Sequence, residues 1–354
     1  MPGPGPDLGE GATRLPVDLL YIGVKGKIDA GLAAREHIEF RDVTAGPLRA
    51  GTLAGTARGG VRLAAGTAQA LAILQRFNPD VVFATGGYGS VGVGLAARAL
   101  RKRLLLFLPD VEAGLAVRTL VRVASRIAVT VPPALEIMPS KKTVLTGYPV
   151  RDAFFKADRQ QGRERLGLAP DLPTLLVSGA SSGASRLNES VSAWAQDFLK
   201  MGQLVHLCGE GDEPRVRRSL ETLPPDLRER YHLHAYLHDE MPLAMAAADL
   251  AVMRSGASVL GELPATGLPA ILVPGEYEGW DQSPNARYLE SEGAAVMLRQ
   301  SQLDDLHAQV MYLINNRPRL QAMRKALARL AQPEASGRLA RLIVEMAGET
   351  SNGR

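Results

Sequence analysis

A run of small residues in the second half of the chain has the pattern of an anion-binding turn. Leu250–Met253 reads as a buried strand, and directly after it comes Arg254-Ser255-Gly256-Ala257-Ser258-Val259-Leu260-Gly261-Glu262. Where a strand is followed by small residues and then a helix, main-chain N–H groups and the positive end of the helix dipole point to the same place and can bind an anion there. Small side chains also let a diphosphate approach the main chain closely. Taken alone, the same pattern also fits plain packing of a helix start.

Two further features could recognise a sugar. Glu262 lies one helical turn beyond Ser258, where its carboxylate could accept hydrogen bonds from both hydroxyls of a ribose. After the next predicted strand comes a loop, Gly275–Asn285, at the edge where open α/β sheets bind ligands. Its amides and carboxylate could read sugar hydroxyls, although a solvated loop would have the same composition. The side chains concerned are Asp281, Gln282 and Asn285.

Three more glycine-rich turns follow predicted strands. They are Ser178–Ala184, Thr85–Gly92 and Gly147–Arg151. Glycines at such places are often simply tight turns. The joint occurrence of all these turns, in this order, is what makes them informative.

Strands and helices alternate in two series that divide near residue 150. The strands expected from short apolar runs are Asp18–Gly23, Glu39–Val43, Asp80–Ala84, Leu104–Leu108, Arg126–Val129, Thr174–Val177, Leu204–Leu207, His232–Ala235, Leu250–Met253, Ala270–Val273 and Ala295–Leu298. The helices expected are a long one through Leu63–Leu74, then Val93–Leu100, Ala116–Ser125, Asn188–Lys200 and a tail within Leu303–Gly348. This alternation predicts the α/β class, with doubly wound parallel sheets covered on both faces. We expect domains at residues 1–150 and 151–330 and a helical tail at 331–354.

Composition and charge narrow the classes of partner. Among the 354 residues, 46% are hydrophobic and 22% are charged, which excludes a disordered chain. The net charge of +4 is too small to argue for nucleic acid. Residues 1–150 hold 18 basic and 11 acidic side chains, a net +7, whereas the remainder has a net −3. A basic first half fits an anionic lipid surface or a pyrophosphate, and an ordinary fluctuation of charge is the alternative.

Several kinds of segment are not expected. No apolar run reaches the roughly 18 residues of a membrane span, and the first residues do not resemble a secretion signal. The single cysteine, Cys208, excludes an internal disulfide and a cysteine-built zinc site. His232 and His234 share one face of a strand, with His238 beyond it, but this is a weak metal pattern. We therefore expect a cytosolic protein without a tightly bound metal.

The order of the motifs resembles the MurG family of glycosyltransferases. The resemblance runs from about Asp18 to about Leu342 and is most specific at Thr85–Tyr88, Gly147–Arg151, Gly179–Asn188, Asp249–Glu262 and Gln282–Ala286. It implies a GT-B fold, in which two Rossmann-like doubly wound domains face a cleft and the donor nucleotide lies mainly on the second domain. It also implies inverting transfer of N-acetylglucosamine from UDP-GlcNAc to undecaprenyl-pyrophosphoryl-N-acetylmuramoyl-pentapeptide in peptidoglycan synthesis. The protein would attach peripherally to the cytoplasmic face of the membrane, with no nucleic-acid partner and no cofactor besides the donor substrate.

The resemblance implies a role for each matching residue. Ser181 and its turn would approach the diphosphate, which Arg151 helps to neutralise. Leu237 would present its main chain to the uracil, and Glu262 would hold the ribose. Gln282 would read sugar hydroxyls. The remaining candidates for substrate binding are Ser255, Gly256, Ala257, Ser258, Val259, Leu260 and Gly261 at the helix start, together with Asn285, Gly86 and Gly87.

The sequence departs from the family in its first residues. The family opens with a strand, a Gly-Gly-Thr-Gly-Gly-His loop and a helix, whereas this sequence opens with Met1-Pro2-Gly3-Pro4-Gly5-Pro6 and reaches the family's second strand almost at once. About 30 residues of a βα unit, including a normally central strand, have no counterpart. We expect that Met1 is not the start of the working protein. A genuine short form with rearranged strand pairing is the alternative.

The catalytic base is left open. An inverting transfer needs a group that takes the proton of the acceptor hydroxyl. The family's usual His-Glu-Gln-Asn is here Phe107-Leu108-Pro109-Asp110, so its histidine and glutamate are lost. Tyr148 also replaces an asparagine, and Asp281 replaces the usual His or Gln. Asp110 or Glu112 could serve as the base, the base could lie elsewhere, or Asp110 could only accept a bond from a sugar hydroxyl.

Two other functions remain open at this point. One is a different nucleotide-sugar enzyme, with another lipid acceptor or with UDP-GlcNAc 2-epimerase activity; the acid/base pairs of the epimerases have no recognised counterpart here. The other is a protein that binds UDP-GlcNAc without catalysis.

Overall fold

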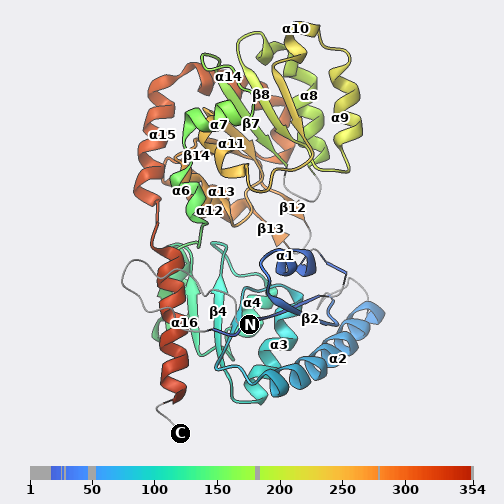
Figure 1. Cartoon of the computed structure of the whole chain (residues 1–354), viewed down its shortest axis with the longest axis vertical. Coiled ribbons are helices and arrows are strands. Elements are labelled where there is room, and N and C mark those ends of the chain that lie inside the picture. Colours follow the sequence, from blue (N-terminus) through green and yellow to red (C-terminus); the bar gives the residue numbers. More distant parts are fainter. Residues whose placement is uncertain are drawn as a thin grey trace. The chain divides into compact units, whose positions relative to one another are not determined.

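The computed structural model describes residues 17–24, 26–27, 29–46, 53–179, 184–277 and 280–351, and Figure 1 shows the course of the chain. The chain forms two compact units. The first comprises residues 1–147 and 334–354, and the second comprises residues 148–333. The chain therefore crosses from the first unit to the second and then returns.

The first unit is built from parallel strands and the helices between them. Its elements are β1 (Leu20–Val24), α1 (Asp29–Arg35), β2 (Glu39–Val43), α2 (Leu53–Phe77), β3 (Val81–Ala84), α3 (Tyr88–Ala99), β4 (Arg103–Leu108), α4 (Leu115–Leu120), β5 (Arg126–Val129), α5 (Pro133–Glu136), a 3₁₀ turn at Ser140–Lys142, β6 (Thr143–Leu145) and α16 (Ala335–Ser351). Among the residues that the structure describes, β1 pairs only with β2, while β3, β4, β5 and β6 form a separate sheet in that order. The alternation of strands and helices in the sequence predicts one parallel sheet in this unit, whereas the strands among the described residues form two.

Glycines account for a difference between the expected and observed α3. This helix begins at Tyr88, five residues before the predicted start, so Gly89 and Gly92, which were expected to form a turn, lie inside it. A Cβ atom at Gly92 would lie 3.3 Å from the backbone nitrogen of Thr67 in α2. One at Gly94 would lie 2.4 Å from Leu120 Cδ2. These glycines allow close helix packing, although in sequence they resemble turn residues.

The last helix completes the first unit. Strand β4 is buried almost throughout, as its apolar run predicted. Helix α16 contacts β3 and carries the buried residues Leu339, Leu342 and Met346. Arg338 Nε donates to Thr146 O at 2.9 Å, and Arg103 Nη1 donates to Met346 O at 2.6 Å. The expected helical tail is therefore part of the first unit's packing.

The second unit is a doubly wound α/β domain. Its elements are α6 (Asp152–Lys156), α7 (Arg159–Arg165), β7 (Thr174–Ser178), α8 (Ser185–Leu199), β8 (Gln203–Leu207), α9 (Glu213–Leu220), α10 (Pro225–Arg228), β9 (Tyr231–His234), α11 (Met241–Ala247), β10 (Leu250–Met253), α12 (Val259–Thr266), β11 (Ala270–Leu272), β12 (Glu276–Tyr277), β13 (Trp280–Asp281), α13 (Ser283–Ser291), β14 (Ala295–Met297), a 3₁₀ segment at Gln300–Asp305, α14 (Leu306–Asn315) and α15 (Arg317–Leu330). The six-stranded parallel sheet has the order β14-β11-β10-β7-β8-β9.

Helices cover this sheet on both faces (Figure 1). Residues of α8, α9 and α14 form one core with Leu175, Val177 and Val252 of the central strands. Helix α11 packs with α7 and α12 and contacts β7, and its buried residues lie outside that core. Because both faces of the sheet are covered, its central strands are buried at almost every position, which explains why they read as continuous apolar runs in sequence. The prediction that Gly275–Asn285 is a loop is wrong in part. This segment contains the β12–β13 hairpin, and Ser283–Asn285 already belong to α13.

Candidate functional site

The winding of the second sheet marks one place for a ligand. From β7 the chain winds outward through β8 to β9, and it then resumes at β10 on the other side of β7. Strands β7 and β10 are thus neighbours at which the direction of winding reverses, and Arg254 N donates to Ser178 O between them. In open α/β sheets, ligands bind outside the carboxyl ends of the strands at such a point. The turns that follow β7 and β10 are the predicted diphosphate turns.

The turn after β10 presents unpaired main-chain donors. The N–H groups of Gly256, Ala257 and Ser258 have no acceptor among the described residues, and Ser258 precedes the first residue of α12. Within α12, Gly261 lets the helix approach the segment after residue 147. A Cβ atom there would lie 2.5 Å from Val150 Cγ2 and 2.9 Å from Tyr148 Cδ1. The start of α12 is therefore packed on that segment and has free donors for an anion.

Hydrogen bonds hold the next loop against this turn. The Ser255 hydroxyl donates to Gln282 O at 3.0 Å, and Asn285 Nδ2 donates to Ser255 O at 2.9 Å. Gln282 Oε1 accepts from Gly275 N at 2.8 Å. Ser255, Gln282 and Asn285 are all buried. The side-chain oxygen of Gln282 thus already accepts one bond within the protein, whereas its amide nitrogen has no acceptor among the described residues.

Sequence reasoning missed Arg254 as a part of this site. The side chain is buried, and its guanidinium donates to Val273 O at 3.3 Å, Pro274 O at 3.0 Å and Gln300 Oε1 at 2.7 Å. It thereby joins the β10 turn to the segment after β11. Its position directly after a fully apolar strand was the available signal, because a cation there needs several acceptors.

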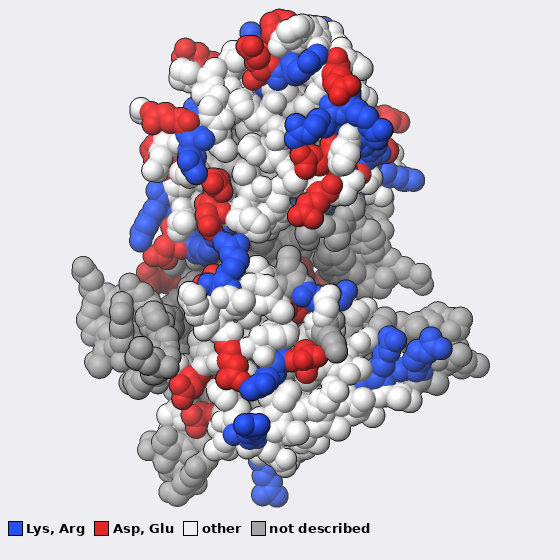
Figure 2. Space-filling model, turned by 45° about the vertical axis from the view of Figure 1, so that its right-hand side comes forward, with Lys and Arg blue, Asp and Glu red and all other residues white. Residues whose placement is uncertain are grey.

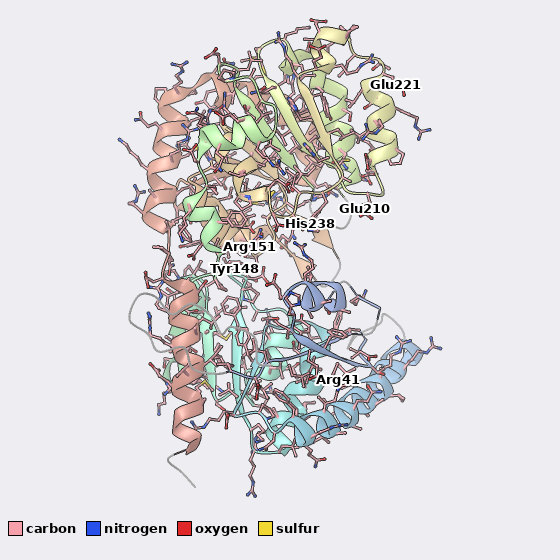
Figure 3. All side chains as sticks on the ribbon, in the orientation of Figure 1. Arg41, Tyr148, Arg151, Glu210, Glu221 and His238 are labelled. Carbon is pink, nitrogen blue, oxygen red and sulfur yellow. The ribbon has the colours of Figure 1, made fainter. Side chains whose placement is uncertain are left out.

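Two more predicted residues, Arg151 and Leu237, come together at the loop that follows β9. The exposed Arg151 donates through Nη2 to His238 O at 3.4 Å and lies 3.6 Å from an oxygen of Asp239, in the loop that also contains Leu237 (Figure 3). The Leu237 side chain is buried, and its main-chain groups have no partner among the described residues. Backbone donors and acceptors in this state suit a planar polar ring such as a nucleobase.

The electrostatics of Glu262 link it to its neighbours. Burial raises the pKa of the Glu262 carboxyl, while the hydrogen bond from Ser258 and the charge of Arg151 act to lower it. A half-buried carboxylate with a nearby cation is a strong acceptor for hydroxyl groups. The structure thus brings Arg151 and Ser258 close to the Glu262 carboxyl.

The remaining predicted residues fall into two sets. Ser181 lies outside the described residues; on either side of its turn, a Cβ atom at Gly179 would lie only 2.0 Å from Ala184 Cβ, so the ends of the turn close tightly. In the first unit, Gly86 and Gly87 both have positive φ, +88° and +81°, which favours glycine. Asp110 and Glu112 follow β4, the parallel neighbour of β3, so they lie at the same edge of that sheet as the two glycines. Asp110 is half-buried and Glu112 is exposed.

The described residues contain neither a metal-binding cluster nor a membrane-spanning helix. Within the part of the chain that the structure describes, no group of three or more His, Cys, Asp and Glu residues is placed to hold a metal ion. No described helix has both the length and the apolar character needed to cross a bilayer.

The family models and the curated relatives that match the sequence agree on one family. Residues 12–129 match the glycosyltransferase family 28 N-terminal domain, and residues 174–339 match the corresponding C-terminal domain. A UDP-N-acetylglucosamine–N-acetylmuramyl-(pentapeptide) pyrophosphoryl-undecaprenol N-acetylglucosamine transferase of Roseiflexus is 38% identical, over 92% of this chain and 82% of its own.

Solved structures show the same fold. The crystal structure of Acinetobacter baumannii MurG has a TM-score of 0.68 at 24% identity, over 92% of this chain and 90% of that one. A UDP-GlcNAc 2-epimerase of Neisseria meningitidis bound to UDP-GlcNAc has a TM-score of 0.62 at 14% identity, over 93% and 91%. The fold, GT-B, therefore does not separate transferases from epimerases, but the sequence identity does: the chain belongs to the MurG family of N-acetylglucosaminyltransferases, within glycosyltransferase family 28.

Proposed function

We propose that this protein transfers N-acetylglucosamine from UDP-GlcNAc to undecaprenyl-pyrophosphoryl-N-acetylmuramoyl-pentapeptide, a step of peptidoglycan synthesis. The observation that carries the proposal is the arrangement of Arg151, Ser258 and Glu262 beside the free N–H groups of the β10 turn. We infer the substrates themselves from the family to which the chain belongs.

The second unit would bind the four parts of the donor, which are the uracil, the ribose, the diphosphate and the sugar, through different groups. The unpaired main chain of Leu237 would bond the uracil, and Glu262 would accept from the ribose hydroxyls. The N–H groups of Gly256, Ala257 and Ser258 would bond the diphosphate, with Arg151 as its counter-ion. Gln282 would donate its amide N–H to a hydroxyl of the sugar. This assignment uses each group in the bonding role that the structure leaves open to it.

The chemistry requires charge stabilisation and a proton acceptor. As the bond between the sugar and UDP breaks, negative charge grows on the diphosphate, and preorganised N–H groups and a guanidinium stabilise that charge. The acceptor hydroxyl, which attacks the sugar carbon, loses its proton to a base. We assign this role to Asp110 in preference to Glu112, because a half-buried carboxylate is less hydrated than an exposed one.

The lipid-linked acceptor would be met at the membrane surface. Arg58 and Arg62 are exposed on α2, and Val61 between them is 70% exposed. Figure 2 shows Lys and Arg side chains gathered on this part of the first unit. Arg49, a third expected contact, lies outside the described residues. Exposed cations beside an apolar side chain favour peripheral attachment to anionic lipids.

One assay separates the possible functions. UDP release is followed from UDP-GlcNAc with and without the lipid acceptor, and the sugar products are identified. Release that depends on the acceptor, with formation of a disaccharide on the lipid, supports the proposal. Acceptor-independent conversion to the 2-epimer would indicate an epimerase, and UDP binding with no turnover would indicate a binding protein; either result overturns the proposed activity.

A further inference from the structure

A chain of buried hydrogen bonds crosses the second unit from β9 to the start of α8. His206 on β8 and Asn188 in α8 are both fully buried, with 0% exposure. His206 Nδ1 lies 2.5 Å from the hydroxyl oxygen of Tyr231, and its Nε2 lies 3.0 Å from Asn188 Oδ1. Asn188 Nδ2 in turn donates to Cys208 O at 2.9 Å and to the Asp212 carboxylate at 2.8 Å.

The partners fix the direction of each bond. Because Cys208 O and the Asp212 carboxylate only accept, the Asn188 atom that faces both is the amide nitrogen, and Oδ1 faces His206. His206 must therefore carry its proton on Nε2, and Nδ1 accepts from the Tyr231 hydroxyl. Burial lowers the pKa of His206 to about 4, so this neutral form persists at physiological pH. Only one tautomer of His206 satisfies the whole chain.

Asp212 connects the same chain to the beginnings of two helices. Its carboxylate accepts from the hydroxyl of Ser185, the first residue of α8, at 2.8 and 3.0 Å, and from Arg215 at 2.9 Å. Asp212 itself directly precedes α9. Both helices begin at the carboxyl edge of the sheet, and α8 follows the turn after β7 at the point where the winding reverses. The buried chain thus fixes the position of the first turn of α8.

We propose that His206 is a positioning residue for the donor: through Asn188 it holds the first turn of α8 in the place from which that turn binds the pyrophosphate. The inference rests on the function proposed above, since the start of α8 belongs to the site only if the chain binds a nucleotide diphosphate. Hydrogen bonds from a helix N-terminus are short-ranged, so a displacement of about 1 Å weakens them. His206 acts without touching the ligand.

The consequence of removing the imidazole follows from its bonds. Asn188 Oδ1 and the Tyr231 hydroxyl would each lose a buried partner, which favours a shift of the helix start toward other partners. A role in folding alone would lower stability without changing affinity. The two roles are separated by measuring both quantities.

The test compares His206→Phe with a control on the same strand. Gln203 on β8 is also buried, and it bonds Ala169 and Thr174, at the opposite edge of the sheet. Gln203→Met therefore removes a buried polar group, and its hydrogen bonds, at the amino end of the strands. Stability is measured by urea unfolding, UDP binding by calorimetry on the folded fraction, and KM and kcat with UDP-GlcNAc.

We expect both variants to lose stability, whereas only His206→Phe binds UDP more weakly, by about tenfold. Its KM for UDP-GlcNAc should rise with little change in kcat. His206→Gln, which can still donate to Asn188, should recover part of the affinity. If His206→Phe does not fold, Tyr231→Phe removes a single hydroxyl from the chain and should raise the dissociation constant about threefold.

The outcomes distinguish the two proposals. If the parent binds UDP and His206→Phe, or in its place Tyr231→Phe, binds UDP equally well, the positioning role is wrong and the proposed function stands. An equal loss of affinity in Gln203→Met would also overturn it, because the effect would then be one of general destabilisation. If the parent protein itself binds no UDP, both the proposed function and this inference fail.

Discussion

At the scale of single residues, Glu262 combines a partly buried carboxylate with a neighbouring cation. Replacing Glu262 with alanine should weaken UDP binding by about 1.5 to 3 kcal/mol, or roughly tenfold to a hundredfold, because charge-assisted hydrogen bonds to the ribose are lost. Calorimetry with UDP measures this change. Glu221→Ala is the matched control: it removes an exposed carboxylate elsewhere in the second unit (Figure 3) and should leave affinity unchanged. Equal UDP affinity of Glu262→Ala and the parent would remove Glu262 from the ribose site.

The two carboxylates after β4 can be told apart by kinetics. Asp110→Asn should lower kcat by about 10²- to 10⁴-fold with the KM for UDP-GlcNAc unchanged, because a general base acts on the acceptor hydroxyl. Glu112→Gln should leave kcat within about twofold of the parent, since the side chain is exposed. A rise in KM without loss of kcat in Asp110→Asn would indicate that Asp110 binds the sugar. Loss of kcat in Glu112→Gln alone would reverse the assignment.

His206 also predicts a dependence of stability on pH. Its folded pKa of about 4 lies below its ordinary value of 6.5, so between these values the unfolded chain binds more protons. This contribution is therefore present above pH 6.5 and is lost as the pH falls toward 4; from pH 7.5 to pH 5 it amounts to about 2 kcal/mol. Burial also lowers the pKa of His232 and His234, so these histidines contribute to the same pH dependence. Comparing the parent with His206→Gln isolates the contribution of His206. Urea unfolding at both pH values should give a smaller loss for the variant, and identical losses would contradict the prediction.

At the scale of elements, the packing of α12 on the segment at Tyr148 depends on Gly261. Gly261→Ala should destabilise the second unit by about 1 to 3 kcal/mol, because the added Cβ atom would overlap Val150 and Tyr148. Gly337→Ala in α16 is the control: its nearest neighbour lies at 3.5 Å, so the better helix propensity of alanine should stabilise by about 0.5 to 1 kcal/mol. Denaturant unfolding measures the change in the free energy of unfolding for both variants. Changes of the same sign in the two variants would contradict this packing argument.

The elements show what the sequence can and cannot predict. Strands such as β4 and β10 were found because a buried parallel strand is a continuous apolar run. The start of α3 was placed too late because Gly89 and Gly92 are needed for packing on neighbours distant in sequence, which local propensity does not reveal. The hairpin at β12 and β13 was missed because its strands have only two residues each.

The same limit applies to the candidate site. Ser258 and Glu262 could be paired from sequence because they share one face of one helix. Arg254 and His206 could not be interpreted, because their partners come from other strands and loops and are fixed only by the fold. Residues that touch a ligand through a local motif were thus predictable, whereas residues that position such a motif were not.

At the scale of the whole molecule, charge is divided unequally along the chain. Residues 1–150 carry a net +7 and the others a net −3, so anionic lipid should attract the first part of the chain. Binding to vesicles that contain phosphatidylglycerol should exceed binding to neutral phosphatidylcholine vesicles and should fall with added salt. Equal binding to both at low and high salt would contradict an electrostatic contact.

A pair of charge reversals locates that contact. Replacing Arg58 and Arg62 with glutamate should weaken binding to the anionic vesicles by at least about thirtyfold, since each cation near the surface contributes about 1 kcal/mol. Lys325→Glu with Arg329→Glu makes the same change of charge on α15 of the second unit, where both side chains are exposed. That control should have a much smaller effect in vesicle co-sedimentation. Equal effects of the two pairs would show that only net charge matters.

The return of the chain into its first unit has a consequence during synthesis. Arg338 of α16 bonds Thr146, which is 192 residues earlier, whereas the second unit is one uninterrupted stretch of chain. At 5 to 20 residues per second, the ribosome needs on the order of 10 to 40 s to make the residues between them. During that time β3 lacks the helix that packs against it, and the second unit can fold first. The unit that is synthesised first is therefore the one that is completed last.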